Sequence, residues 1–160
     1  MGETCSVLIL SDVHYACDRE KARQNFECAA IESPVVRSLV QFYRHYIWLR
    51  DPFAHNHLLQ HVLDPPFQPG LVVANGDYSC DSAFIGVSDP AACESAAECL
   101  SLLRDRFAPN LLTTFGDHEL GKVSLAGNRG GLRLASWNAA QQNLQLQPFS
   151  YLLFLLASRQ

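Results

Sequence analysis

The chain has 160 residues, of which 48% are hydrophobic and 18% are charged, as in an ordinary globular domain. Its 12 basic and 16 acidic residues give a formal net charge of −4, so the composition does not show the excess of basic residues that is typical of nucleic-acid-binding proteins. No apolar run reaches the roughly 20 residues that a membrane-spanning helix needs. We therefore expect a cytoplasmic protein with no membrane association and with reduced cysteines.

Apolar runs and helix-start signals alternate along the chain in the order strand, helix, strand, helix, strand. This order predicts an α/β fold with a mostly parallel sheet and flanking helices. A helical insertion at about 18–69 separates the first two strands. Strands are expected over 6–10, 71–74, 110–115 and 151–156, the first two buried. Helices are expected from Ser33-Pro34 until Asp51-Pro52, over 54–63, from Asp89-Pro90 to about Phe107 and over 132–143.

A polar motif follows each of the first three strands. Because ligands bind beyond the carboxyl ends of parallel strands, the three motifs are expected to share one edge of the sheet. Carboxylates and imidazoles suit Mn, Fe or Zn, and a histidine also suits proton transfer near neutral pH. Each motif taken alone is better explained as a plain turn or an acidic helix start than as a metal site. The motifs are Ser11-Asp12-Val13-His14, Asn75-Gly76-Asp77 and Gly116-Asp117-His118-Glu119.

Taken together, the three motifs resemble the calcineurin-like metallophosphoesterases, whose signature is D-x-H, G-D and G-N-H-[DE], followed by histidines in G-H and G-H-x-H. The resemblance covers about residues 6–120. It implies the first half of an αββα sandwich and a centre of two divalent ions, Mn, Fe or Zn. It also implies an enzyme that hydrolyses a phosphorylated substrate by attack of a metal-bound hydroxide.

The resemblance assigns metal ligands to four positions. Asp12 and His14 would bind the first metal, and Asp77 would bridge both metals. Asp117 would bind the second metal, although the family usually has asparagine at this position. The additional carboxylate is expected to alter metal preference rather than to abolish binding.

The resemblance also assigns supporting roles. His118 would be the catalytic residue, contacting the phosphate and the leaving oxygen. Glu119 would orient His118 without touching metal. Asn75 would support the site, and Arg129 could contact a phosphate oxygen, although a solvated loop arginine is the simpler reading.

No histidine follows His118, so the family's later ligands have no counterpart in this sequence. We therefore expect residues 1–160 to form one truncated domain that supplies about half of a two-metal site. The missing ligands could come from a second chain or copy, which would also cover an exposed sheet. They could instead come from His55, His57 and His61, which otherwise form an ordinary exposed helix face or a separate zinc site.

A rival interpretation is a non-catalytic metal-binding or interaction fragment with the same half fold. The substrate within the family is not indicated by the motifs. The insertion carries the aromatic residues Tyr43, Tyr46, Trp48 and Phe53. These are expected to pack the helices of the insertion onto the domain, with a cap over a substrate pocket as the alternative.

Overall fold

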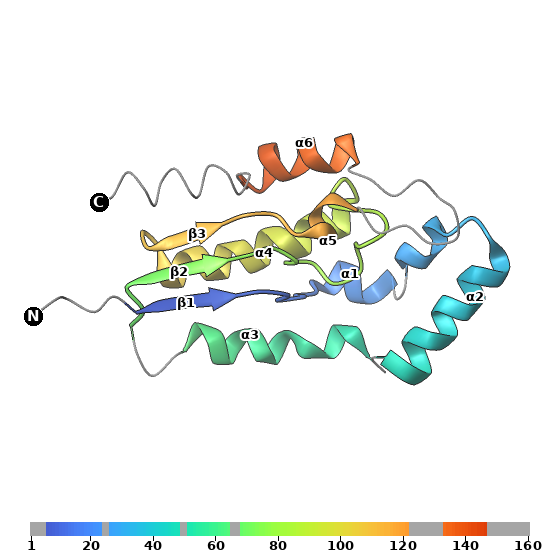
Figure 1. The fold of residues 1–160 in the computed structure, drawn as a ribbon, viewed down its shortest axis with the longest axis horizontal. Helices are drawn as coiled ribbons and strands as arrows, with labels where there is room; N and C mark the ends of the chain where they lie inside the picture. The colour runs from blue at the N-terminus through green and yellow to red at the C-terminus, as the bar shows by residue number, and fades with distance from the viewer. Residues whose placement is uncertain (1–5, 24–25, 49–50, 65–67, 122–132, 147–160) are drawn as a thin grey trace, which may run out of the picture.

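The fold is built on a parallel sheet of three strands in the order β1-β2-β3 (Figure 1). The computed structural model describes residues 6–23, 26–48, 51–64, 68–121 and 133–146. The strands are β1 (Val7–Leu10), β2 (Leu71–Ala74) and β3 (Leu111–Thr113). Because all three run in the same direction, their carboxyl ends meet at one edge. The predicted α/β class and parallel sheet are confirmed in the described part of the chain.

The segment between β1 and β2 is helical, as the insertion at about 18–69 predicted. Helix α2 begins where the sequence signal placed it, because the Ser33 side chain accepts a hydrogen bond from the Val36 N–H at 3.4 Å and Pro34 is its first residue. The segment contains α1 (Asp18–Arg23), η1 (Phe26–Ala30), α2 (Pro34–Tyr43), the π-helix η2 (Arg44–Trp48), η3 (Pro52–His55) and α3 (Asn56–Leu63).

Helix α4 (Pro90–Phe107) packs on the sheet and confirms the predicted bounds. The Asp89 carboxylate caps it by accepting hydrogen bonds from Ala91 N–H and Ala92 N–H. Its Leu100 and Leu103 are fully buried in the main core. Among the described residues after β3 there are two helices, α5 (Asp117–Leu120) and α6 (Leu134–Asn143), the second within the predicted 132–143.

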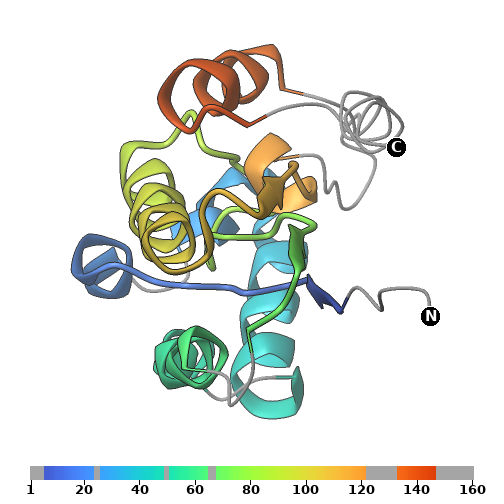
Figure 2. The same ribbon diagram turned by 90° about the vertical axis from the view of Figure 1, so that its left-hand side faces the viewer.

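The first strand is buried on one side only, which corrects the prediction of a fully buried strand. Leu10 is 8% exposed and faces the core, whereas Val7 and Ile9 are 51% and 65% exposed. Successive side chains of a strand point to opposite faces, and α3 and α4 lie on one side of the strands (Figure 2). Strand β3 is also shorter than the predicted 110–115.

Three expectations from the sequence fall outside what the structure describes. These are the strand at 151–156, the phosphate contact of Arg129 and the packing of the Trp48 side chain. Across the ranges that the structure does describe, no helix combines the length and apolar character needed to cross a bilayer.

Candidate metal centre at the edge of the sheet

Three of the four predicted metal ligands come together beyond the ends of β1 and β2. Ligand atoms of Asp12, His14 and Asp77 all lie within 4.8 Å of one another. His14 Nε2 is 3.8 Å from Asp12 Oδ1. Donors bind a transition metal at about 2.0–2.2 Å, so two donors on one ion stand roughly 3–4 Å apart. The three side chains therefore have a spacing that fits a shared ion.

The backbone at these three residues has an uncommon conformation. Asp12, His14 and Asp77 have φ angles of 56°, 48° and 56°, in the left-handed region that favours glycine. Of the described residues other than glycine, only Gln145 shares this property. Such a conformation costs about 1–3 kcal/mol per residue and is concentrated at functional sites. The strain thus coincides with the proposed ligands.

Backbone hydrogen bonds hold the first two loops together. His14 N–H donates to the Asp77 carbonyl at 2.8 Å, and Tyr15 N–H donates to the Tyr78 carbonyl at 2.9 Å. His14 Nδ1 lies 3.3 Å from the Ser79 carbonyl oxygen. A proton on Nδ1 satisfies that contact and leaves the Nε2 lone pair, on the side of Asp12, for a metal.

The Glu119 carboxylate joins the second and third loops. It is 0% exposed and accepts hydrogen bonds from the N–H groups of Gly116, Asp77 and Tyr78, each at 2.8 Å. Burial raises the pKa of Glu119 to about 7, against the lowering effect of these bonds. Both carboxylate oxygens are engaged by backbone N–H groups, which positions the Asp77 loop, and the predicted role of Glu119 in orienting His118 stays a prediction.

His118, the predicted catalytic residue, packs edge-on against His14 with ring centroids 4.5 Å apart. Its backbone N–H donates to Asp77 Oδ1 at 3.0 Å. Its Nδ1 lies 3.2 Å from the hydroxyl oxygen of Ser82, which lies 2.7 Å from that of Ser79. Burial, followed by the nearby His14, lowers the pKa of His118 to about 4.

The two serines were missed by sequence reasoning. The only signal for them was the polar character of the loop after β2.

Asp117 lies outside the group of three ligands, although it lines the same cavity. Burial raises the pKa of Asp77, and the charge of Asp117 contributes to that rise. A second metal position at Asp117 stays a prediction. Asn75 is exposed, and its backbone N–H donates to the Leu10 carbonyl at 2.8 Å, so a role for its side chain also stays a prediction.

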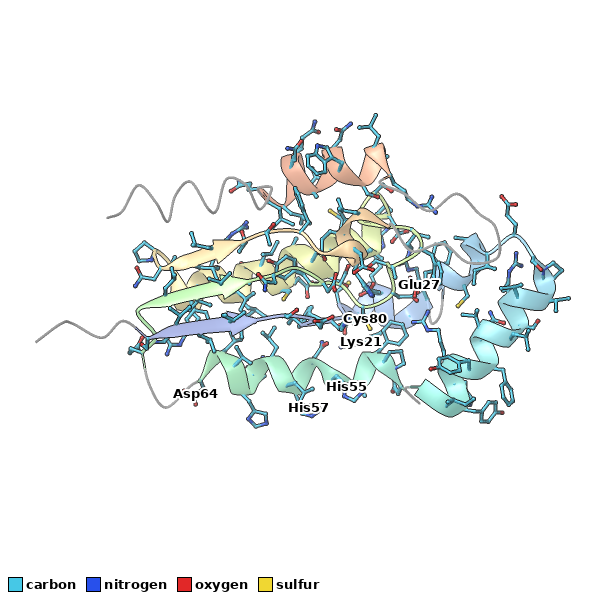
Figure 3. The ribbon with its side chains drawn as sticks, in the orientation of Figure 1. Lys21, Glu27, His55, His57, Asp64 and Cys80 are labelled. Atoms are coloured by element: carbon cyan, nitrogen blue, oxygen red, sulfur yellow. The ribbon has the colours of Figure 1, made fainter. Side chains whose placement is uncertain are left out.

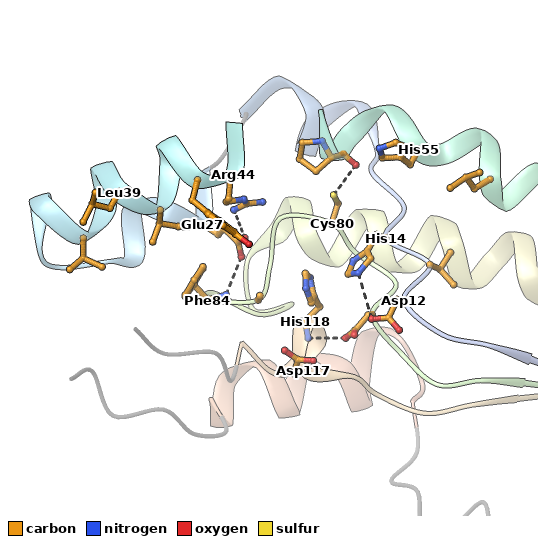
Figure 4. A pocket seen from close by; sticks show the side chains of 18 residues that line it. Asp12, His14, Glu27, Leu39, Arg44, His55, Cys80, Phe84, Asp117 and His118 are labelled. Atoms are coloured by element: carbon orange, nitrogen blue, oxygen red, sulfur yellow. Dashed lines mark hydrogen bonds and ion pairs between the residues drawn. The ribbon is translucent and has the colours of Figure 1, made fainter. Parts of the chain in front are cut away.

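A cavity of about 960 Å³ opens from the candidate metal ligands (Figure 4). His55 also lines this cavity. Hydrogen bonds of two nearby residues, Asn56 and Pro52, hold this part of the chain near the site. Asn56 forms two hydrogen bonds with the backbone of Ala16, at 2.8 and 2.9 Å, and Cys80 Sγ donates to the Pro52 carbonyl at 3.3 Å.

The histidines of the insertion divide into two groups. His57 and His61 are exposed, as the plain reading of this helix face predicted. Their ring centroids are 6.5 Å apart. His55, the last residue of η3, is half-buried and lines the cavity, whereas His57 lies on α3 (Figure 3).

An ion network lies beside the cavity. Arg44 Nη1 pairs with the carboxylates of Glu27 and Asp81, and all three residues are buried. Burial raises the pKa of Glu27 to about 7. Because two carboxylates already oppose the charge of Arg44, this network adds no positive charge next to the carboxylates of the metal site. The local charge therefore favours a cation.

A second group of possible metal donors is already occupied by protein contacts. It contains Cys17, Glu94 and Glu98. Glu94 pairs with Arg19 at 3.4 Å, and Glu98 accepts a hydrogen bond from the Tyr15 hydroxyl at 3.0 Å. These contacts account for the cluster without an ion.

Comparison of the chain with models of protein families, with curated proteins and with solved structures finds no match.

Proposed function

We propose that this chain is a metal-dependent hydrolase of phosphoesters, of the calcineurin-like type. The observation that carries the proposal is the clustering of Asp12, His14 and Asp77 within 4.8 Å at the carboxyl edge of a parallel sheet. Two carboxylates and one imidazole suit Mn, Fe or Zn. When bound, divalent ions would acidify water and neutralise charge on the phosphate.

The residues of the chain have separate tasks in this proposal. Asp12, His14 and Asp77 hold the ions. Asp77 also accepts a hydrogen bond from the His118 N–H, which links it to the third loop. Ser82 engages His118 Nδ1 and so leaves Nε2 to contact a phosphate or leaving oxygen. Glu119 fixes the loop that carries Asp77.

The test is to measure Mn²⁺ binding by calorimetry and the hydrolysis of 4-nitrophenyl phosphate on the same preparations. The site variant is Asp77→Asn. The matched control is Asp105→Asn, the same substitution at an exposed position on α4. We expect Mn²⁺-dependent turnover in the wild type and in the control, and its loss together with Mn²⁺ binding in Asp77→Asn.

Two other outcomes oppose the proposal in different ways. Mn²⁺ binding that depends on Asp77 without turnover would favour the rival, a non-catalytic metal-binding fragment. An absence of Mn²⁺ binding in the wild type would contradict both interpretations.

A further inference from the structure

Helix α2 presents an apolar stripe to the cavity. Val36, Leu39, Val40 and Tyr43 recur at helical spacing, and all four line the cavity. No residue of α2 is fully buried, and Leu39 and Tyr43 are 62% and 49% exposed. The expectation that Tyr43 packs the helix onto the domain is therefore wrong, because this stripe faces a cavity instead of a core.

The aromatic residues of the insertion differ in their environments. Phe53 packs with Ala16 and Cys80 in a small buried cluster, which confirms the packing prediction for this residue. Tyr46 is 70% exposed and contacts the rings of Phe42 and His45. Tyr43 alone of these described side chains lines the cavity.

The cavity joins a polar end to an apolar end. In Figure 4, Asp12, His14, Asp117 and His118 gather on one side, and α2 with Leu39 lies on the other. Leu58 of α3 and Phe84 of the loop after β2 extend the apolar wall. Small-molecule sites typically have volumes of about 300–1,000 Å³, so about 960 Å³ has room for a phosphate and a sizeable attached group.

The charges that line the cavity argue against a strongly anionic substrate. Arg44 is the one lysine or arginine among the described lining residues, and its charge is opposed by Glu27 and Asp81. A polyphosphate or an acidic phosphopeptide would need further unpaired cations. An apolar group needs none, and it would remove apolar surface of α2 from water.

We infer that the phosphoester taken by this site has an apolar alcohol, as in an aryl or alkyl phosphate, and that the α2 stripe binds this part. This inference rests on the proposed function for the phosphate end.

The experiment compares two substrates and two variants in the presence of Mn²⁺. The substrates are 1-naphthyl phosphate and phenyl phosphate, whose leaving phenols have similar acidity but differ in apolar area. Leu39→Ser changes the stripe. Val35→Ser is the matched control, because Val35 lies on the same helix, is 68% exposed and is not among the lining residues. Because both sites are largely exposed, both variants should fold, and circular dichroism checks this.

We expect the wild type to prefer 1-naphthyl phosphate by about tenfold or more in kcat/KM, the range that loss of one apolar contact in a pocket typically gives. Leu39→Ser should lose most of that preference by reacting more slowly with the naphthyl ester alone. Val35→Ser should match the wild type. Equal rates on both esters, or equal effects of the two variants, would overturn the inference.

Binding of 1-naphthylphosphonate, followed by its fluorescence, separates this inference from the proposed function. Binding weakened by Leu39→Ser but not by Val35→Ser, without turnover of either ester, would support the apolar ligand and contradict the hydrolase. Turnover without any dependence on Leu39 would support the hydrolase and contradict the apolar ligand. Absence of both would contradict both.

Discussion

Replacement of Glu119 by glutamine tests whether this carboxylate holds the candidate site together. The wild-type side chain accepts three backbone hydrogen bonds, from Gly116, Asp77 and Tyr78, and it is 0% exposed. Glutamine has nearly the same shape but exchanges one acceptor oxygen for an NH₂ donor. At least one buried N–H must then face another donor.

The expected loss can be worked from those contacts. An unsatisfied buried donor costs about 1–3 kcal/mol, and a hydrogen bond to a charged acceptor contributes about 1.5–3 kcal/mol. We therefore expect Glu119→Gln to lower the free energy of unfolding by about 2–4 kcal/mol. This is a large part of the roughly 5–15 kcal/mol by which a typical domain is stable. Because Asp77 N–H is one of the donors, Mn²⁺ affinity should fall as well.

The assay is urea unfolding followed by circular dichroism, with EDTA present, at pH 8. This pH is above the pKa of about 7 to which burial raises Glu119, so the wild-type carboxylate is charged. Glu98→Gln is the matched control, since Glu98 is exposed and accepts one bond from the Tyr15 hydroxyl. The control should change stability by no more than about 0.5 kcal/mol. Equal midpoints and equal slopes for Glu119→Gln and the wild type would refute the reasoning.

Three further predictions concern the site and its surroundings. In Gly116→Ala, the new Cβ would lie 2.0 Å from Asp77 Oδ1, so the Asp77 carboxylate must move. Mn²⁺ affinity measured by calorimetry should therefore fall about tenfold or more. Unchanged affinity would contradict this prediction. Burial raises the pKa of Glu27 from 4.5 to about 7, so the folded chain keeps this proton to higher pH than the unfolded chain does. Its contribution to the free energy of unfolding therefore falls as pH rises from about 4.5 to about 7, and Glu27→Gln should flatten that part of the profile in urea titrations at several pH values; parallel profiles would refute it. Replacing both exposed residues, His57 and His61, by alanine should leave Mn²⁺ affinity unchanged, and a loss would place them in the metal site.

Elements with local signals could be predicted from the sequence alone. Ser33 and Asp89 each precede a proline, and each caps the helix that begins at that proline. The apolar runs gave the parallel strands, and the polar residues after them gave Asp12, His14 and Asp77 as one cluster. Such signals can be read from neighbouring residues because capping, strand pattern and connection order depend on short stretches of chain.

Contacts between residues far apart in the sequence could be seen only in the folded chain. Glu119 binds the backbone of Asp77, 42 residues away, and its buried carboxylate could not be told from an ordinary acidic residue of a helix start. The Ser82 contact with His118 spans 36 residues. The apolar stripe of α2 has helical spacing, but such a pattern identifies the apolar face of a helix and not what lies opposite it. Here the neighbours of α2 leave a cavity beside the metal ligands, which makes Leu39 a candidate for substrate contact instead of a core residue.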